Sequence, residues 1–124
     1  MEKKLALVTD DMAINRVAIK GFLSIIGLTV ELAEDGLIAS KMLNQKKYDV
    51  IFSDIEMPNM NGYELLRAAK RHPLNGSTPV IMLSTLNKPE DIDKAKKLGA
   101  SFYMVKPFTA DGVKNALKTL NIIS

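Results

Sequence analysis

The sequence predicts an α/β fold, a doubly wound sheet of five parallel strands with helices on both faces. Two observations support this prediction: short apolar runs recur along the chain, and each is followed by a segment whose apolar residues have helical spacing. Strands that alternate with helices pair in parallel, and right-handed crossovers then restrict the topology to a doubly wound sheet. The chain has 124 residues, which fits one core, and we expect residues 1–124 to be a single domain with no output domain.

The composition excludes several classes of protein. With 47% hydrophobic and 25% charged residues the chain resembles ordinary globular domains, and without cysteine it has neither disulfides nor thiolate chemistry. No segment has the length and apolarity of a signal peptide or a membrane span, so we expect a cytoplasmic location and no membrane partner. The net charge is +3, but the basic residues are scattered and aromatic residues are few, which argues against direct nucleic-acid binding.

The first predicted strand and helix lie at the start of the chain. Leu5–Val8 is a short apolar run that ends in the acidic pair Asp10-Asp11. Residues 13–26 follow as a helix, and Gly27 is typical of a helix C-terminus. The apolar residues that indicate this helix are Ile14, Val17, Ala18, Leu23 and Ile25.

The second strand differs in character from the third. Residues 28–32 alternate apolar and polar side chains, which is typical of a half-exposed strand at the edge of a sheet. Asp35-Gly36 then turns the chain into a helix that we expect to end near Lys46-Lys47, because cations favour a helix C-terminus. The run that begins at Val50 and ends at Asp54 is apolar and rich in β-branched and aromatic residues, so it predicts a strand buried on both faces.

The second half of the chain predicts three helices and two strands. Asn61 and Glu64 have the spacing of a capping box, so a helix is expected from Gly62 to about Arg71. Residues 79–83 and 102–105 predict the last two strands, which end in Ser84-Thr85 and Lys106-Pro107. The remaining helix signals are Pro89 at a start, Gly99 after an end, Thr109 as a cap, and Val113, Ala116, Leu117 and Leu120 facing inward.

Polar side chains follow four of the five predicted strands. A lone aspartate at a strand end is equally well explained as a cap or a turn residue. The carboxyl ends of parallel strands, however, meet at one edge of the sheet, where doubly wound folds bind their ligands. The residues brought to that edge are Asp10, Asp11, Asp54, Ser84, Thr85 and Lys106.

Three aspartates and one lysine leave this site with excess negative charge, which a divalent cation would neutralise. Hard carboxylate oxygens suit Mg²⁺, and the chain offers no cysteine and one histidine for a softer ion. Together with Mg²⁺, Lys106 and a hydroxyl donor would supply the electrostatic stabilisation that phosphoryl transfer needs. Asp54 would then be the nucleophile, forming an aspartyl phosphate.

These motifs resemble the receiver domains of two-component response regulators, most closely the stand-alone chemotaxis-regulator type. The matching features, in chain order, are Asp10-Asp11, Asp54 with Met57-Pro58 and Gly62, Ser84, Gly99-Ala100, Tyr103 and Lys106-Pro107. The resemblance covers essentially the whole chain. It implies a flavodoxin-like fold with the strand order 2-1-3-4-5 and a cis bond before Pro107.

The resemblance also implies roles for individual residues. Asp54 would accept a phosphoryl group from a sensor histidine kinase or phosphotransfer domain, and Lys106 and Ser84 would contact that group. Asp11, Asp54 and the backbone carbonyl of Glu56 would bind Mg²⁺, with Asp10 acting through water. Ser84 and Tyr103 would form the switch that changes the face made by the fourth helix, fifth strand and fifth helix, where a downstream protein binds.

Two residues beside the site, Thr85 and Glu56, are not fixed by the resemblance. Thr85 stands where Ala or Gly is usual, so we expect its bulk to slow phosphoryl turnover. Glu56 stands at a variable position, and its side chain would either repel anions or meet a cation such as Lys88.

Two alternative functions remain open at this stage. One is a Mg²⁺-dependent phosphatase of the haloacid-dehalogenase type, although that class has an aspartate where this chain has Glu56. The other is a docking module of the same fold without phosphorylation. We expect no enzyme activity beyond self-phosphorylation and dephosphorylation.

Overall fold

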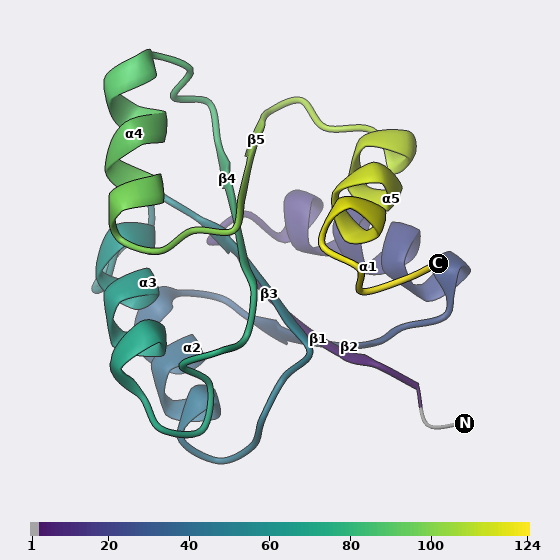
Figure 1. The fold of residues 1–124 in the computed structure, drawn as a ribbon, viewed down its shortest axis with the longest axis horizontal. Coiled ribbons are helices and arrows are strands. Elements are labelled where there is room, and N and C mark those ends of the chain that lie inside the picture. Colours follow the sequence, from purple (N-terminus) through teal and green to yellow (C-terminus); the bar gives the residue numbers. More distant parts are fainter. Residues whose placement is uncertain (1–2) are drawn as a thin grey trace.

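The computed structural model describes residues 3–124, which form a parallel sheet covered by helices on both faces (Figure 1). Within these residues the strands are β1 (Leu5–Thr9), β2 (Thr29–Ala33), β3 (Val50–Asp54), β4 (Val80–Ser84) and β5 (Phe102–Val105). The helices are α1 (Ala13–Ile26), α2 (Gly36–Leu43), α3 (Gly62–Arg71), α4 (Pro89–Lys97) and α5 (Ala110–Thr119). The strand order is β2-β1-β3-β4-β5 with every neighbouring pair parallel, which confirms the predicted fold class and strand order.

Two layers of helices bury the two faces of the sheet. In Figure 1, α1 and α5 cover one face, and α2, α3 and α4 cover the other. Successive residues of β3 point to opposite faces: Phe52 packs in the core under α1 and α5, and Ile51 packs in the core under α2 and α3. A strand that contributes to both cores has no solvent-facing side, which explains why β3 starts with three consecutive apolar residues, Val50 to Phe52.

Burial along the strands follows the sequence pattern. Every residue of β3 and β4 is buried, whereas in the edge strand β2 Ala33 alone is buried. The alternation at residues 28–32 therefore correctly predicted an edge strand. Because β3 and β4 lie at the centre of the sheet, their carboxyl ends are held rigidly, and Asp54 and Ser84 are the last residues of those strands.

The helix starts confirm the capping predictions. Asn61 accepts a hydrogen bond from the Glu64 amide at 2.9 Å while the Glu64 carboxylate accepts one from the Asn61 amide at 3.1 Å, which completes a capping box. Thr109 caps α5, and Pro89 is the first residue of α4. Within residues 3–124, every helix is too short or too polar to span a bilayer.

The predicted helix at residues 13–26 is confirmed, but most of the apolar residues that indicated it lie on its solvent side. Leu23 is buried as expected, together with Ile19. Ile14, Val17 and Ile25, in contrast, are 73%, 65% and 86% exposed. Helical spacing locates a helix but does not tell which apolar stripe meets the sheet when the helix carries two.

The prediction that the second helix ends near Lys46-Lys47 was wrong, because α2 ends at Leu43. The cause is Asn75, a fully buried residue of the α3–β4 connection. Its side-chain amide donates to the carbonyl oxygens of Leu43 at 2.8 Å and Lys46 at 2.9 Å. These bonds satisfy carbonyls that a longer helix would have used, and Lys46 instead pairs with Glu31 on β2 at 2.7 Å.

Candidate functional site

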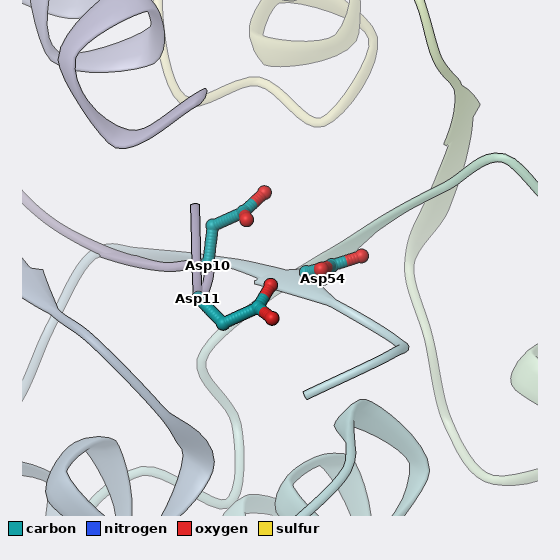
Figure 2. Close-up of side chains that lie close together, drawn as sticks. All are labelled: Asp10, Asp11 and Asp54. Atoms are coloured by element: carbon teal, nitrogen blue, oxygen red, sulfur yellow. The ribbon is translucent and has the colours of Figure 1, made fainter. Parts of the chain in front are cut away.

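Three carboxylates meet where the neighbouring strands β1 and β3 end (Figure 2). Asp10 and Asp11 follow β1, and Asp54 is the last residue of β3. One carboxylate oxygen of each residue lies within 4.8 Å of the others. Asp10 and Asp54 are buried and Asp11 is exposed, so the cluster opens to solvent on the side of Asp11.

Lys106, which follows β5, reaches across the end of the sheet to these acids. Its ammonium lies 3.0 Å from Asp10 Oδ2 and 3.3 Å from Asp54 Oδ1. Burial by itself would lower the pKa of Lys106, but the hydrogen bond to Asp10 and the charge of Asp54 outweigh it and raise that pKa. The next residue, Pro107, follows a cis peptide bond, as the resemblance implied.

Asp54 is a strongly perturbed acid. It is 5% exposed, and one of its oxygens accepts a hydrogen bond from the Ile55 amide at 2.9 Å. Burial and the neighbouring charge of Asp10 raise its pKa to about 6, against the lowering effect of Lys106. Near neutral pH the carboxylate is therefore ionised in a site that disfavours its negative charge. A bound cation would stabilise that charge.

Both carboxylate oxygens and the backbone carbonyl oxygen of Asp10 accept hydrogen bonds. It is fully buried, and its Oδ1 accepts the Met12 amide at 2.9 Å while its Oδ2 accepts Lys106. The guanidinium of Arg16, on the first turns of α1, donates to the Asp10 carbonyl oxygen at 2.6 Å. Sequence reasoning missed this contact, although Arg16 is a charged residue on the same helical side as Ile19 and Leu23, which face the sheet.

The backbone of Leu86 connects the two residues expected to form the switch. Its amide donates to Ser84 Oγ at 2.9 Å, and its carbonyl oxygen accepts the Tyr103 hydroxyl at 2.8 Å. Ser84 is buried at the end of β4, and Tyr103 is half-buried on the neighbouring strand β5. Rotation of the Ser84 hydroxyl toward the acids would leave the Leu86 amide without its acceptor and so disturb the segment that holds Tyr103.

Glu56 and Thr85 lie close together just past the ends of β3 and β4. The Thr85 hydroxyl donates to Glu56 Oε1 at 3.3 Å. Glu56 makes no ion pair within residues 3–124, so of the two alternatives for its side chain the cation partner is absent from this part of the chain. Both side chains are exposed.

The loop after β3 packs against the loop after β2 and is hydrogen-bonded to it. Asn59, which has a φ of 68°, donates to Asp35 Oδ2 at 3.1 Å, and a Cβ on Gly36 would lie 2.2 Å from the Met60 carbonyl oxygen. Gly62 is equally constrained, because a Cβ there would lie 2.2 Å from the Asp54 carbonyl oxygen. The loop that carries the Glu56 carbonyl is thereby fixed close to Asp54; no sequence signal pointed to the Asp35–Asn59 bond.

The arrangement suits a hard divalent cation bound beside an acceptor carboxylate. All side-chain donors of the cluster are carboxylates, the ligands that Mg²⁺ prefers, and a cation would offset the burial and the charge of Asp10 that raise the pKa of Asp54. Lys106 places a second positive charge 3.3 Å from Asp54 Oδ1. A phosphoryl group on Asp54 would thus be stabilised by the positive charge of both the cation and Lys106.

Comparisons with known proteins agree with this geometry. The family model described as the response regulator receiver domain matches residues 6–118. The chemotaxis protein CheY of Pseudomonas aeruginosa is 35% identical over 115 residues, which is 92% of this chain and 93% of that protein. A solved structure of the chemotaxis response regulator CheY4 of Vibrio cholerae is 32% identical, has a TM-score of 0.91, and covers 96% of this chain and 99% of that chain.

A further relative has a different architecture. The sensor protein EvgS of Escherichia coli is 32% identical over 123 residues, which is 99% of this chain, but the chain spans 10% of that protein's length. A segment similar to this chain therefore occurs both in chemotaxis regulators of the same size and within a much longer sensor protein. With the family match over almost its entire length, the chain belongs to the response regulator receiver domain family.

Proposed function

We propose that this receiver domain is a phosphorylation-dependent signalling switch in which Asp54 accepts the phosphoryl group. The observation that carries the proposal is the buried Asp54 carboxylate, 3.3 Å from the Lys106 ammonium and grouped with Asp10 and Asp11. Receiver domains are signalling switches and not enzymes that turn over a separate substrate. This chain would catalyse its own phosphorylation and dephosphorylation alone.

Asp11, Asp54 and the backbone carbonyl of Glu56 would hold Mg²⁺ directly, and Asp10 would act through a water molecule. The donor set supports this assignment, because Asp11 is exposed and Asp10 is already bonded through both of its carboxylate oxygens. When bound, the ion supplies positive charge to the oxygens of the transferring phosphoryl group.

In the transfer step, an Asp54 carboxylate oxygen attacks the phosphorus of a phosphohistidine on a sensor kinase or phosphotransfer domain. A new P–O bond forms as the P–N bond breaks, and the imidazole nitrogen leaves and takes a proton from solvent. Lys106 and the Ser84 hydroxyl contact the phosphoryl oxygens. Water later attacks the phosphorus, which releases inorganic phosphate and restores the Asp54 carboxylate.

The switch would work through the backbone of Leu86. When Ser84 turns toward the phosphoryl group, the Leu86 amide loses the acceptor that it has at 2.9 Å. The Leu86 carbonyl holds the Tyr103 hydroxyl, so a shift of this residue releases or repositions Tyr103. The face formed by α4, β5 and α5 changes as a result, and a downstream protein binds there.

The phosphodonor would dock on α1. Ile14, Val17 and Ile25 form an exposed apolar stripe, and a groove of about 340 Å³ beside it is also lined by Thr85, Lys106 and Phe108. Within the stripe, Ile14 lines this groove together with Lys106, which contacts Asp54, so the Ile14 end of the stripe is the end nearer the acceptor. Ile14→Glu should slow phosphotransfer from a histidine kinase without slowing labelling by acetyl phosphate; equal loss with both donors would contradict this docking site.

We also propose a cytoplasmic location, because a switch of this kind receives its phosphoryl group from a kinase.

The two alternative functions are less favoured than the switch. A phosphatase of the haloacid-dehalogenase type has a second aspartate where this chain has Glu56, and the Glu56 carboxylate bonds to Thr85. A docking module without phosphorylation would have no need for Asp10 and Asp54 to be buried with Lys106 at an electrostatic cost.

The test is Mg²⁺-dependent labelling by radioactive acetyl phosphate. The natural chain and the Asp93→Ala control, which alters an exposed acid of α4, should incorporate acid-stable, base-labile label in Mg²⁺ and none in EDTA. Asp54→Ala should incorporate none. Label that survives the Asp54 substitution would refute the assignment, and turnover of phosphate monoesters would favour the phosphatase.

A further inference from the structure

Glu56 and Thr85 face each other because the pairing of β3 with β4 continues past the strands. Asp54 is opposite Leu83 in the register of the sheet, and the Ile55 amide still donates to the Leu83 carbonyl oxygen at 3.2 Å. The next residues along each segment are therefore directed to the same opening. There the Thr85 hydroxyl donates to Glu56 Oε1 at 3.3 Å, while Asp54 beneath is 5% exposed.

We propose that the Thr85–Glu56 hydrogen bond is a latch over the acceptor site that slows phosphorylation of Asp54 by small anionic phosphodonors such as acetyl phosphate. The inference rests on the proposed function and identifies two residues that determine which donors reach Asp54. Neither residue reacts: both control access to a carboxylate that does.

The chemistry of the pair explains the effect. The Glu56 carboxylate is an anion at the opening through which a negatively charged phosphodonor has to pass. An unrestrained glutamate side chain rotates into solvent at little cost, but the hydrogen bond to Thr85 restricts that rotation and holds the carboxylate near the end of β4. Thr85 is a good anchor because a β-branched side chain has a restricted χ1.

The latch is distinct from a simple effect of size at Thr85. If bulk alone slows the reaction, a valine of the same shape will be as slow as threonine. If the hydrogen bond is responsible, valine will release Glu56 and speed the reaction even though the side chain is no smaller. A comparison of the labelling rates of the natural chain, Thr85→Val and Thr85→Ala therefore separates the two mechanisms.

The experiment measures the rate of Asp54 labelling by acetyl phosphate in saturating Mg²⁺. Thr85→Val should label about twofold to tenfold faster than the natural chain, the range that corresponds to one net hydrogen bond. Thr29→Val is the matched control, since Thr29 is an exposed threonine at the start of β2, and it should label at the natural rate. A Thr85→Val rate equal to that of the natural chain would overturn the latch.

A double-mutant cycle gives an independent test. Glu56→Ala should also accelerate labelling, and adding Thr85→Val to it should produce no further increase, because the bond is already absent. Glu56→Gln keeps an oxygen that accepts from Thr85 and removes the charge, so it should be faster than the natural chain, and Thr85→Val should accelerate it less than it accelerates the natural chain. Fully additive effects of Thr85→Val and Glu56→Ala would show that the residues act separately and would refute the proposal.

Two measurements keep the latch distinguishable from the proposed function. Mg²⁺ affinity from calorimetry and the thermal unfolding midpoint should be unchanged in Thr85→Val, since the hydroxyl touches neither a ligand oxygen nor the core. A natural chain that takes no Mg²⁺-dependent label would contradict the proposed function and the latch with it. A natural chain that takes label, with unchanged rates in the variants, would contradict the latch alone.

Discussion

The ammonium of Lys106 lies 3.0 Å from Asp10 Oδ2, although the two residues are 96 positions apart in the chain. Asp10 is fully buried and Lys106 nearly so, with 14% of its side chain exposed. A second acid, Asp54, lies 3.3 Å from the same nitrogen. Lys106 thus compensates two carboxylates at once, and the stability of the site depends on it.

Removing this lysine should destabilise the fold. Lys106→Met leaves the buried Asp10 carboxylate without its cation, and we expect the free energy of unfolding at pH 7 to fall by about 3 kcal/mol. Urea unfolding in EDTA measures the change, and Mg²⁺ should restore part of it because the ion replaces the lost charge. Lys114→Met, at an exposed position of α5, should change stability little; equal effects of both substitutions would contradict the prediction.

Neutralising Asp54 should stabilise the protein at neutral pH. The folded-state pKa is raised from 3.8 to about 6, so between these values the folded chain keeps a proton that the unfolded chain loses. The stability that this proton contributes is present below pH 4 and is lost as the pH rises through 6. In EDTA at pH 7, Asp54→Asn should be more stable than the natural chain by about 2 to 3 kcal/mol.

The pH dependence is the control for this prediction. At pH 4 the carboxyl of the folded natural chain is protonated, so the advantage of Asp54→Asn should largely disappear. Urea unfolding of both proteins from pH 4 to pH 8 provides the comparison. An advantage that is constant across this range would show that the raised pKa is not its cause.

Gly62 and Gly21 should respond oppositely to alanine. At Gly62 a Cβ would lie 2.2 Å from the Asp54 carbonyl oxygen, whereas at Gly21 nothing lies within 4 Å. Gly62→Ala should cost about 3 kcal/mol by forcing α3 away from β3, and it should weaken Mg²⁺ binding. Gly21→Ala, on the solvent side of α1, should stabilise by about 0.5 to 1 kcal/mol. Thermal and urea unfolding test both, and a neutral Gly62→Ala would be inconsistent with this close contact.

Arg16 should act on the metal site through Asp10. Its guanidinium donates to the Asp10 carbonyl oxygen at 2.6 Å and so shapes the turn that presents Asp11. Arg16→Met should weaken Mg²⁺ binding about threefold to tenfold. The affinity of Arg16→Lys should lie between those of the natural chain and Arg16→Met, because the lysine keeps one cationic donor. Calorimetric titration measures the affinity. Lys20→Met, which removes an exposed cation of the same helix, tests for a nonspecific charge effect and should leave the affinity nearly unchanged.

The two errors of sequence interpretation have a common origin. α1 carries two apolar stripes, and the one through Ile19 and Leu23 is buried because it meets the core beneath α5. α2 stops at Leu43 because a buried amide from Asn75, far along the chain, donates to the carbonyl oxygen of this last helical residue. The buried side of α1 and the end of α2 both depend on contacts with another part of the chain. The spacing of residues within a helix does not predict such contacts.

The sequence by itself determined the order of the elements, the central position of β3, the capping box at Asn61 and the group of acids that the strand ends bring together. These features follow from local periodicity and from the rule that parallel strands end at one edge. Tertiary structure alone decided which carboxylates pair with Lys106, that Asp54 has a pKa of about 6, and that Glu56 meets Thr85. Distance and burial govern electrostatics and hydrogen bonding, and both are set only when the folded chain brings distant residues within a few ångströms of each other.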